Sequence, residues 1–192
     1  MILPFSTIIN KKPSYFPEKI LIGLLEKRLT NQPDFNSLCP IFVIINKGDI
    51  KYKIAFDTTI NHRPKYHTIR EDVKARWKEG TRIDFFINVR QPNMYRFAPV
   101  LPVVSTQKVE FIWKDNTENL SCLGITYDRT CTIMIDDKFY ADAYLLNDWV
   151  VPSSYNLNDF ANNDGFDTIE DFFAYFNENY TGKLIHWTNL KY

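Results

Sequence analysis

The chain of 192 residues is poor in cysteine and glycine and carries no net charge. Its three cysteines, Cys39, Cys122 and Cys131, lie far apart without a C-x-x-C pair. This pattern excludes a disulfide framework or zinc knuckle and favours reduced, buried thiols. Because basic and acidic residues balance, no global positive field drives loose binding to nucleic acid. Any nucleic-acid contact must come from a local patch.

Long apolar runs are also missing. The longest, Ile41 to Ile45, is far too short to span a bilayer, and Met1 to Thr7 lacks the pattern of a signal peptide. We therefore expect a soluble cytoplasmic protein that does not contact a membrane. What the chain does have is aromatic residues, with 15 Phe and 11 Tyr, which is typical of a folded globule. Its length suits one domain.

Apolar residues at helical spacing predict three helices. One begins at Pro17, carries Ile20, Leu21, Leu24 and Leu25 on one face, and ends near Leu29. A short one covers Glu71 to Glu79 and stops at Gly80. A third begins with Asp167 as its N-cap and buries Ile169, Phe172, Phe173 and Phe176.

Alternating apolar residues predict strands between these helices. The strand segments are Ile41 to Ile45, Ile50 to Phe56, Ile83 to Val89, Lys108 to Trp113, Thr130 to Ile135, Lys138 to Leu146 and Leu184 to Trp187. The first two flank a short turn and form a hairpin, and Asp136-Asp137 makes a tight turn between two others. Short strands with helices between them indicate an α+β domain with a mostly antiparallel sheet or small barrel.

The most informative segment runs from Lys65 to Arg70, because it places an amine, a hydroxyl and a guanidinium within six residues. In an extended chain Thr68 and Arg70 share one face, while His67 and Ile69 share the other. Lys65 reaches the pocket of Thr68 only if the chain bends near Pro64. A desolvated lysine there has a lowered pKa and can activate Thr68 as a nucleophile. Arg70 would hold an oxyanion or a phosphate.

Charge is unevenly distributed along the chain. Most charged residues of the segment 63–82 are basic, whereas the segment 158–178 has acidic residues and no basic one. If the two meet, they form a cleft with cationic and anionic walls. Arg90 and Arg96 lie near Tyr95 and Phe97, an arrangement that suits stacking on nucleic-acid bases.

Three motifs in order carry a family resemblance. They are Lys65-x-x-Thr68-Ile69-Arg70, then Trp77-Lys78-x-Gly80, and then Ala161-x-x-Asp164-Gly165-Phe166 leading into an aromatic helix. In this order they resemble the ASCH domain family, which is related to the PUA RNA-binding fold. The ending Gly182-Lys183-Leu184-Ile185-His186-Trp187 looks like members encoded by phages and gut bacteria.

The resemblance implies one PUA-like domain, a small β-barrel with flanking helices, in a bacterial or phage-infected cell. It implies a pocket between barrel and helices, lined by Lys65, Thr68 and Arg70, that binds RNA or a modified nucleoside. We expect His67, Arg90 and Arg96 to contribute further ligand contacts. In the amidohydrolases of the family a lysine, a threonine and a distant glutamate remove an acyl group. Their counterparts here are Lys65 as base, Thr68 as nucleophile and Asp164 as acid and base.

Two features depart from the family pattern. Asp164 is one methylene shorter than the glutamate of the enzymes, which reduces its reach. The segment 30–59, with the predicted hairpin, is an insertion relative to compact members. Three functions stay open: binding of RNA or a modified nucleoside, amide hydrolysis, and a phage-type contact with a host protein. No cofactor is implied, and His62, His67 and His186 lack the spacing of a metal site.

Overall fold

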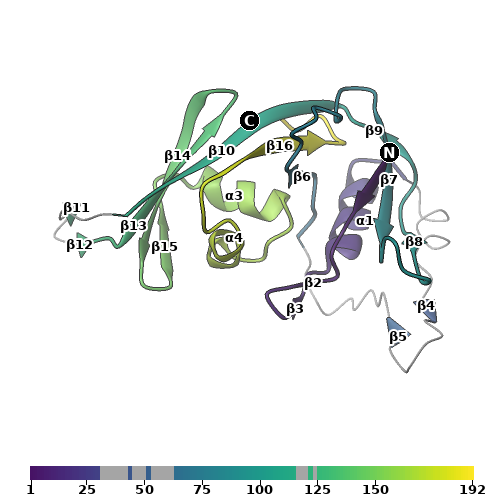
Figure 1. Ribbon diagram of the computed structural model, residues 1–192, viewed down its shortest axis with the longest axis horizontal. Helices are drawn as coiled ribbons and strands as arrows, with labels where there is room; N and C mark the ends of the chain where they lie inside the picture. The colour runs from purple at the N-terminus through teal and green to yellow at the C-terminus, as the bar shows by residue number, and fades with distance from the viewer. Residues whose placement is uncertain (31–42, 45–50, 53–62, 116–120, 123–124) are drawn as a thin grey trace.

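The computed structural model describes residues 1–30, 43–44, 51–52, 63–115, 121–122 and 125–192. Within these residues the fold is mixed α+β, and the paired strands are mostly antiparallel (Figure 1). The described helices are α1 (Phe16–Glu26), α3 (Asn156–Asn163) and α4 (Ile169–Tyr175). The predicted fold class, α+β with a mostly antiparallel sheet, is confirmed at this level.

The larger sheet has six antiparallel strands in the order β15-β14-β13-β10-β16-β6. In chain order these are β6 (His67–Arg70), β10 (Ser105–Asp115), β13 (Arg129–Ile135), β14 (Lys138–Leu146), β15 (Trp149–Pro152) and β16 (Tyr180–His186). The sheet curls around α3 and α4 like half of a barrel (Figure 1). As the alternation predicts, β10 buries Val109, Phe111 and Trp113 on its inner face.

The turn between β13 and β14 is confirmed as predicted. Asp136 and Asp137 both have left-handed backbone angles, with φ of 50° and 62°, which is the geometry of a type I′ hairpin turn. The Asp136 carboxylate accepts hydrogen bonds from the Lys108 backbone N–H and from Gln107 Nε2, each at 2.9 Å. The turn is thereby tied to β10.

A smaller sheet contains the first strand of the chain. Its members are β1 (Ile2–Pro4), β7 (Arg82–Ile87), β8 (Tyr95–Arg96) and β9 (Leu101–Pro102). β1 pairs with β7 in parallel, and β7 pairs with β8 and β9 antiparallel. The predicted strand from Ile83 is confirmed up to Ile87, and its buried face consists of Ile83, Phe85 and Ile87. Two of the two-residue ladders pair β2 (Ile8–Ile9) with β3 (Lys12–Pro13) and β11 (Ser121–Cys122) with β12 (Ile125–Thr126).

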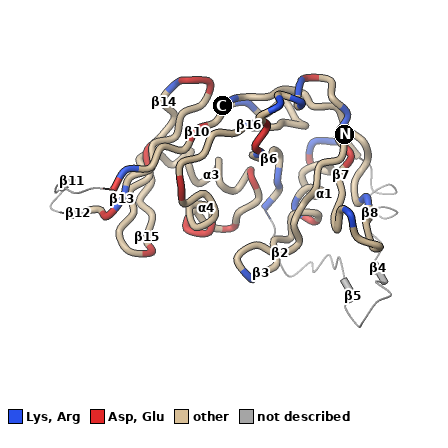
Figure 2. Tube along the Cα trace, in the orientation of Figure 1, with Lys and Arg blue, Asp and Glu red and all other residues tan. Residues whose placement is uncertain are grey.

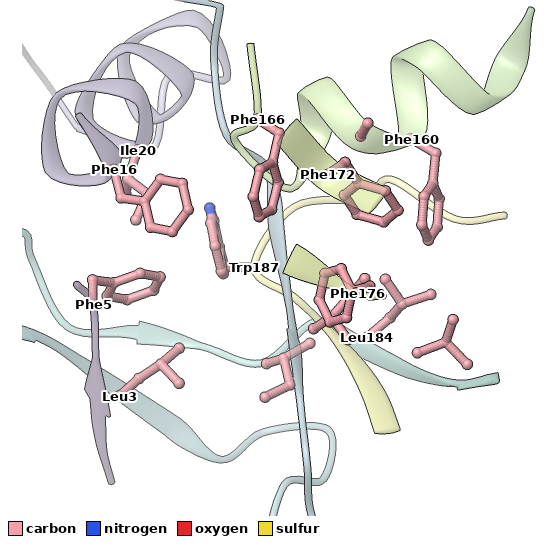
Figure 3. Close-up of a cluster of buried hydrophobic side chains, with 14 of the residues drawn as sticks. Leu3, Phe5, Phe16, Ile20, Phe160, Phe166, Phe172, Phe176, Leu184 and Trp187 are labelled. Carbon is pink, nitrogen blue, oxygen red and sulfur yellow. The ribbon is translucent and has the colours of Figure 1, made fainter. Parts of the chain in front are cut away.

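One aromatic core joins both sheets and the helices. Figure 3 shows Phe5 and Phe16 beside Trp187, with Phe166 and Phe172 further along the same layer. Trp187 is 1 % exposed, and its ring lies 5.3 Å from that of Phe85 in an edge-on contact. Such contacts add to the free energy of burial. The segment that follows β16 is therefore a central part of the core.

Helix positions follow the predicted patterns with small shifts. α1 buries Ile20, Leu21 and Leu24 and has a proline in its first turn. α4 begins one residue later than predicted, because Thr168 is its N-cap and accepts a hydrogen bond from the Asp171 N–H at 3.1 Å.

The predicted helix over Glu71 to Glu79 is wrong, because this segment is a loop. The Asp72 carboxylate accepts hydrogen bonds from the backbone N–H groups of Arg76 and Trp77, each at 2.9 Å. A side chain that captures these donors competes with helical hydrogen bonding. Lys183 Nζ then links Asp72 to the Trp77 carbonyl, so Trp77 is buried while Val73 is 85 % exposed.

Most of the predicted insertion, 30–59, lies outside the described residues. Of its hairpin, β4 (Val43–Ile44) and β5 (Lys51–Tyr52) are described, and they pair antiparallel.

Cys131 is a buried free thiol, and burial raises its pKa to about 12. The side chains of Cys39 and Cys122 are outside the described part. Among the described helices, none has the length and apolar character needed to cross a membrane.

Candidate functional site

The structure brings Lys65 and Asp164 together in the interior. Lys65 Nζ lies 2.8 Å from Asp164 Oδ1 and also donates to the Asp164 carbonyl oxygen. The two side chains are 0 % and 5 % exposed, so the ion pair is removed from water. The basic segment 63–82 and the acidic segment 158–178 therefore meet, and at this point they form a buried contact instead of an open cleft.

Burial shifts the pKa of both groups toward the neutral form. It lowers the pKa of Lys65 to about 8, although Asp164 acts in the opposite direction. It also raises the pKa of Asp164, against the effects of Lys65, Arg70 and the Ile69 N–H. A lysine with a pKa near neutrality is the kind of group that serves as a base in enzymes.

Asp164 also closes the free edge of β6. This strand is the last of the six-stranded sheet, so one row of its backbone groups has no strand partner. Asp164 Oδ1 accepts the Ile69 N–H at 3.1 Å, and the Asn163 carbonyl accepts the Tyr66 N–H at 2.9 Å. His67 Nδ1 lies 3.6 Å from Asp164 Oδ1. Lys65, His67 and Asp164 thus form one buried polar cluster.

Two glycines permit the close approach around Lys65. Gly165 has a φ of +94°, and a Cβ atom there would lie 2.8 Å from Lys65 Cδ. A Cβ at Gly23 of α1 would lie 3.0 Å from the Lys65 carbonyl oxygen. Neighbouring Lys19, 1 % exposed, donates to the Gly165 carbonyl at 2.7 Å and to Asp167 at 2.8 Å. The loop after α3 is therefore held by two buried lysines.

Thr68 and Arg70 have other surroundings. Thr68 is 3 % exposed, pairs with Ile185 of β16 and takes no part in the hydrogen bonds between Lys65 and Asp164. Arg70 Nη2 donates to the Pro4 carbonyl at 2.6 Å, and its guanidinium carbon lies 5.3 Å from the centre of the Phe5 ring. The prediction that Lys65 and Thr68 share an open pocket does not match this arrangement, because the Lys65 amine points to Asp164.

Arg90 and Arg96 are exposed and lie away from this cluster. Arg96 belongs to β8 of the smaller sheet, where its guanidinium is 3.6 Å from Asp84. Neither arginine lines the groove described below. Figure 2 shows basic and acidic positions interspersed over the described chain, with the acidic ones prominent on α4. These two predicted ligand contacts therefore lie away from Lys65, because Arg90 is in the turn after β7 and Arg96 is in β8.

A groove of about 680 Å³ opens beside the buried cluster. One wall comes from the end of α1 and from Tyr66, whose ring lies 4.8 Å below Lys27 Nζ. α3 contributes Asp159 and Asn163, one helical turn apart. The remaining wall is the segment from Trp187 to Leu190. The groove thus joins an aromatic ring with carboxylate and amide groups.

Several buried polar atoms without a hydrogen-bond partner in the described part lie on β6, at the end of β16 and on the residue after it. They include His67 Nδ1, Arg70 Nε, both ring nitrogens of His186, and Trp187 Nε1. His67 and His186 face each other in the register of the two strands, and their rings are 5.4 Å apart. Native proteins rarely bury such groups unpaired, so a cluster of them is a marker of functional sites. Within the described residues no three His, Cys, Asp or Glu side chains form a group that could hold a metal ion.

Sequence reasoning missed Asn163 and Asp159 of the groove, and it missed Tyr192, whose hydroxyl lies 2.8 Å from His67 Nε2 and 3.0 Å from Asn163 Nδ2. Asn163 precedes a candidate acid, and its helical spacing from Asp159 was a usable signal. Tyr192 had no signal, because its position depends on the whole fold. Comparison with family models, with curated proteins and with solved structures gives no match.

Proposed function

We propose that the chain binds a nucleoside, or one nucleotide of single-stranded RNA, in the groove beside Tyr66. The observation that carries this proposal is the composition of the groove. An aromatic ring, a carboxylate and a carboxamide face a space of about 680 Å³, within the range usual for small-molecule sites. Bases bind to proteins by stacking on such rings and by hydrogen bonds to such polar groups. Lys27 adds a positive charge for a phosphate.

Membership of a PUA-like ASCH group is part of this proposal. Three of the four segments that carry the resemblance contribute to the groove: Tyr66 from the lysine motif, Asn163 from the motif that contains Asp164, and Trp187 from the ending, whereas the Trp77 motif does not line it. The curled antiparallel sheet with helices in its concavity is compatible with such a fold.

Titration with nucleosides and short single-stranded RNAs, followed by calorimetry, tests the binding. Replacing Tyr66 by alanine should weaken binding about tenfold or more, because loss of one stacking contact costs about 1–3 kcal/mol. Replacing Asn163 by alanine should also weaken binding, through the loss of its hydrogen bonds to the base. Tyr155→Ala is the matched control, since Tyr155 is 93 % exposed and does not line the groove. Equal affinity in the parent and both groove variants, or no binding by the parent, would reject the proposal.

A second candidate function, hydrolysis of an acylated nucleoside, is favoured by the state of Lys65. Its amine has a pKa lowered to about 8 and lies against a carboxylate, which suits proton transfer. In the structure the Lys65 amine is paired with Asp164. Catalysis would therefore require the Lys65 side chain to turn toward Thr68. Incubation with acetylcytidine should then consume one water and release cytidine and acetate, related amides should give the corresponding amine and acid, and Thr68→Ala should abolish the release. Absence of turnover across the panel excludes this candidate.

A further inference from the structure

The ring of Tyr192 is enclosed by four other rings. Its centroid lies 4.9 Å from that of Phe160, 5.3 Å from His67, 5.7 Å from Tyr140 and 5.9 Å from His186. The contacts are edge-on or tilted, and they come from α3, β6, β14 and β16. We call these four side chains, together with Asn163, the ring box. It encloses a flat six-membered ring on several sides.

The hydroxyl of Tyr192 has two polar partners in the ring box. It lies 2.8 Å from His67 Nε2 and accepts a hydrogen bond from Asn163 Nδ2 at 3.0 Å. The other His67 nitrogen, Nδ1, faces the Asp164 carboxylate at 3.6 Å, which favours a proton on Nδ1 and a lone pair on Nε2. The Tyr192 hydroxyl therefore donates to His67. The box presents an acceptor and a donor side by side.

The ring box also contains polar atoms that make no hydrogen bond to the described residues. His186 is 0 % exposed, and both its ring nitrogens lack a hydrogen-bond partner among the described residues. A phenol offers only one polar group, so it cannot pair with His186 as well as with His67 and Asn163. A ring with polar groups on neighbouring positions would satisfy more of the box.

The ring box and the groove share a wall. Asn163 lines the groove and also bonds to Tyr192. Thr188, Asn189 and Leu190 line the groove just before Tyr192 in the chain. Tyr192 is held by its backbone, because Gln107 donates to its carbonyl at 2.7 Å and accepts its N–H at 2.9 Å. A rotation of the Tyr192 side chain would join the two spaces without breaking these backbone bonds.

We propose that the ring box is a subsite for a uracil-type base and that Tyr192 is the resident ring which such a base displaces. This inference rests on the proposed function and names its substrate class. The N–H of the base donates to His67 Nε2, a neighbouring carbonyl accepts from Asn163 Nδ2, and the second carbonyl accepts from a His186 N–H. Cytosine fits poorly, because it presents a lone pair to His67 Nε2 where uracil has a proton.

Thermal unfolding of Tyr192→Ala in the presence of free uracil, cytosine or phenol tests the subsite. Free uracil at about ten times its Kd should raise the Tm of this variant by about 3–5 °C. Cytosine should give a clearly smaller rise, and the same uracil concentration should have less effect on the parent, where Tyr192 competes. Phenol is the positive probe for the cavity itself. Stabilisation by phenol without stabilisation by uracil, or equal effects of uracil and cytosine, would overturn the proposal.

A second measurement remains informative if Tyr192→Ala does not fold. In the parent protein labelled with fluorotyrosine, excess uridine should shift the ¹⁹F resonance that is missing from Tyr192→Phe. An unchanged resonance at a uridine concentration that saturates the groove overturns the subsite while the groove proposal stands. Conversely, uracil binding to Tyr192→Ala without any nucleoside binding by the parent rejects the groove proposal and also the displacement of Tyr192, because in the parent the base must displace this ring.

Discussion

Lys65 Nζ and Asp164 Oδ1 lie 2.8 Å apart inside the protein, although 99 positions separate the residues in the chain. Asp164 also accepts the Ile69 N–H on the free edge of β6. The carboxylate therefore neutralises a buried cation and completes the hydrogen bonding of an edge strand. This double role makes the pair a structural support of the groove, whatever ligand the groove takes.

Replacing Asp164 by asparagine should destabilise the protein strongly. The change leaves the buried Lys65 amine without its counterion, and such losses cost about 3–5 kcal/mol. Urea unfolding measures the effect. Asp171→Asn is the matched control, because it removes the exposed pair with Lys12 and should cost less than about 1 kcal/mol. Similar losses in both variants would show that the Lys65 pair has no special role.

Gly165→Ala should cost more than Gly80→Ala. Both glycines have left-handed backbone angles, which alone penalise alanine by about 1 kcal/mol. Only at Gly165 would the new Cβ collide, at 2.8 Å from Lys65 Cδ and 2.9 Å from Phe16 Cε1, whereas Gly80 has open space. The difference between the two urea midpoints isolates the crowding. Equal losses would mean that Lys65 and Phe16 shift without cost.

Stability should fall as the pH falls from about 6.5 toward 4, and His186 should cause part of this loss. Burial lowers the pKa of His186 from 6.5 to about 4. In this interval the unfolded chain binds more protons than the folded one, so acid favours unfolding, by up to about 3 kcal/mol for this group. Unfolding free energies of the parent and His186→Gln at several pH values measure it. The parent should show the steeper dependence, and parallel curves would contradict the assignment.

Asp72→Ala should release the loop between β6 and β7. Burial alone would raise the pKa of Asp72, but hydrogen bonds from Trp77, Arg76 and Lys183 lower it below its usual value. Loss of these bonds should cost about 2 kcal/mol or more. Hydrogen exchange should speed up at the Arg76 and Trp77 amides. Glu71→Ala, at an exposed neighbour, is the control and should leave both amides protected, and equal exchange in the two variants would argue against the role of Asp72.

The spacing of apolar residues predicted burial correctly where the buried face follows the period of one helix or strand. Ile20, Leu21 and Leu24 of α1 and Val109, Phe111 and Trp113 of β10 repeat at the helix and strand periods, and all are buried. The helix predicted over Glu71 to Glu79 failed, because Val73 and Trp77 have helical spacing but Asp72 captures the backbone donors. A single polar side chain outweighed the apolar spacing.

The sequence by itself determined the α+β class and the tight Asp136-Asp137 turn, and it singled out Lys65 and Asp164 as candidate site residues. These follow from side-chain periodicity, from backbone preference and, for Asp164, from the order of motifs. Only the tertiary structure decided that the two side chains form a buried pair, that Arg90 and Arg96 lie away from it, and that Tyr192 reaches His67. Those outcomes depend on how strands distant in the chain align and how much water each group loses, and neither quantity is encoded in local spacing.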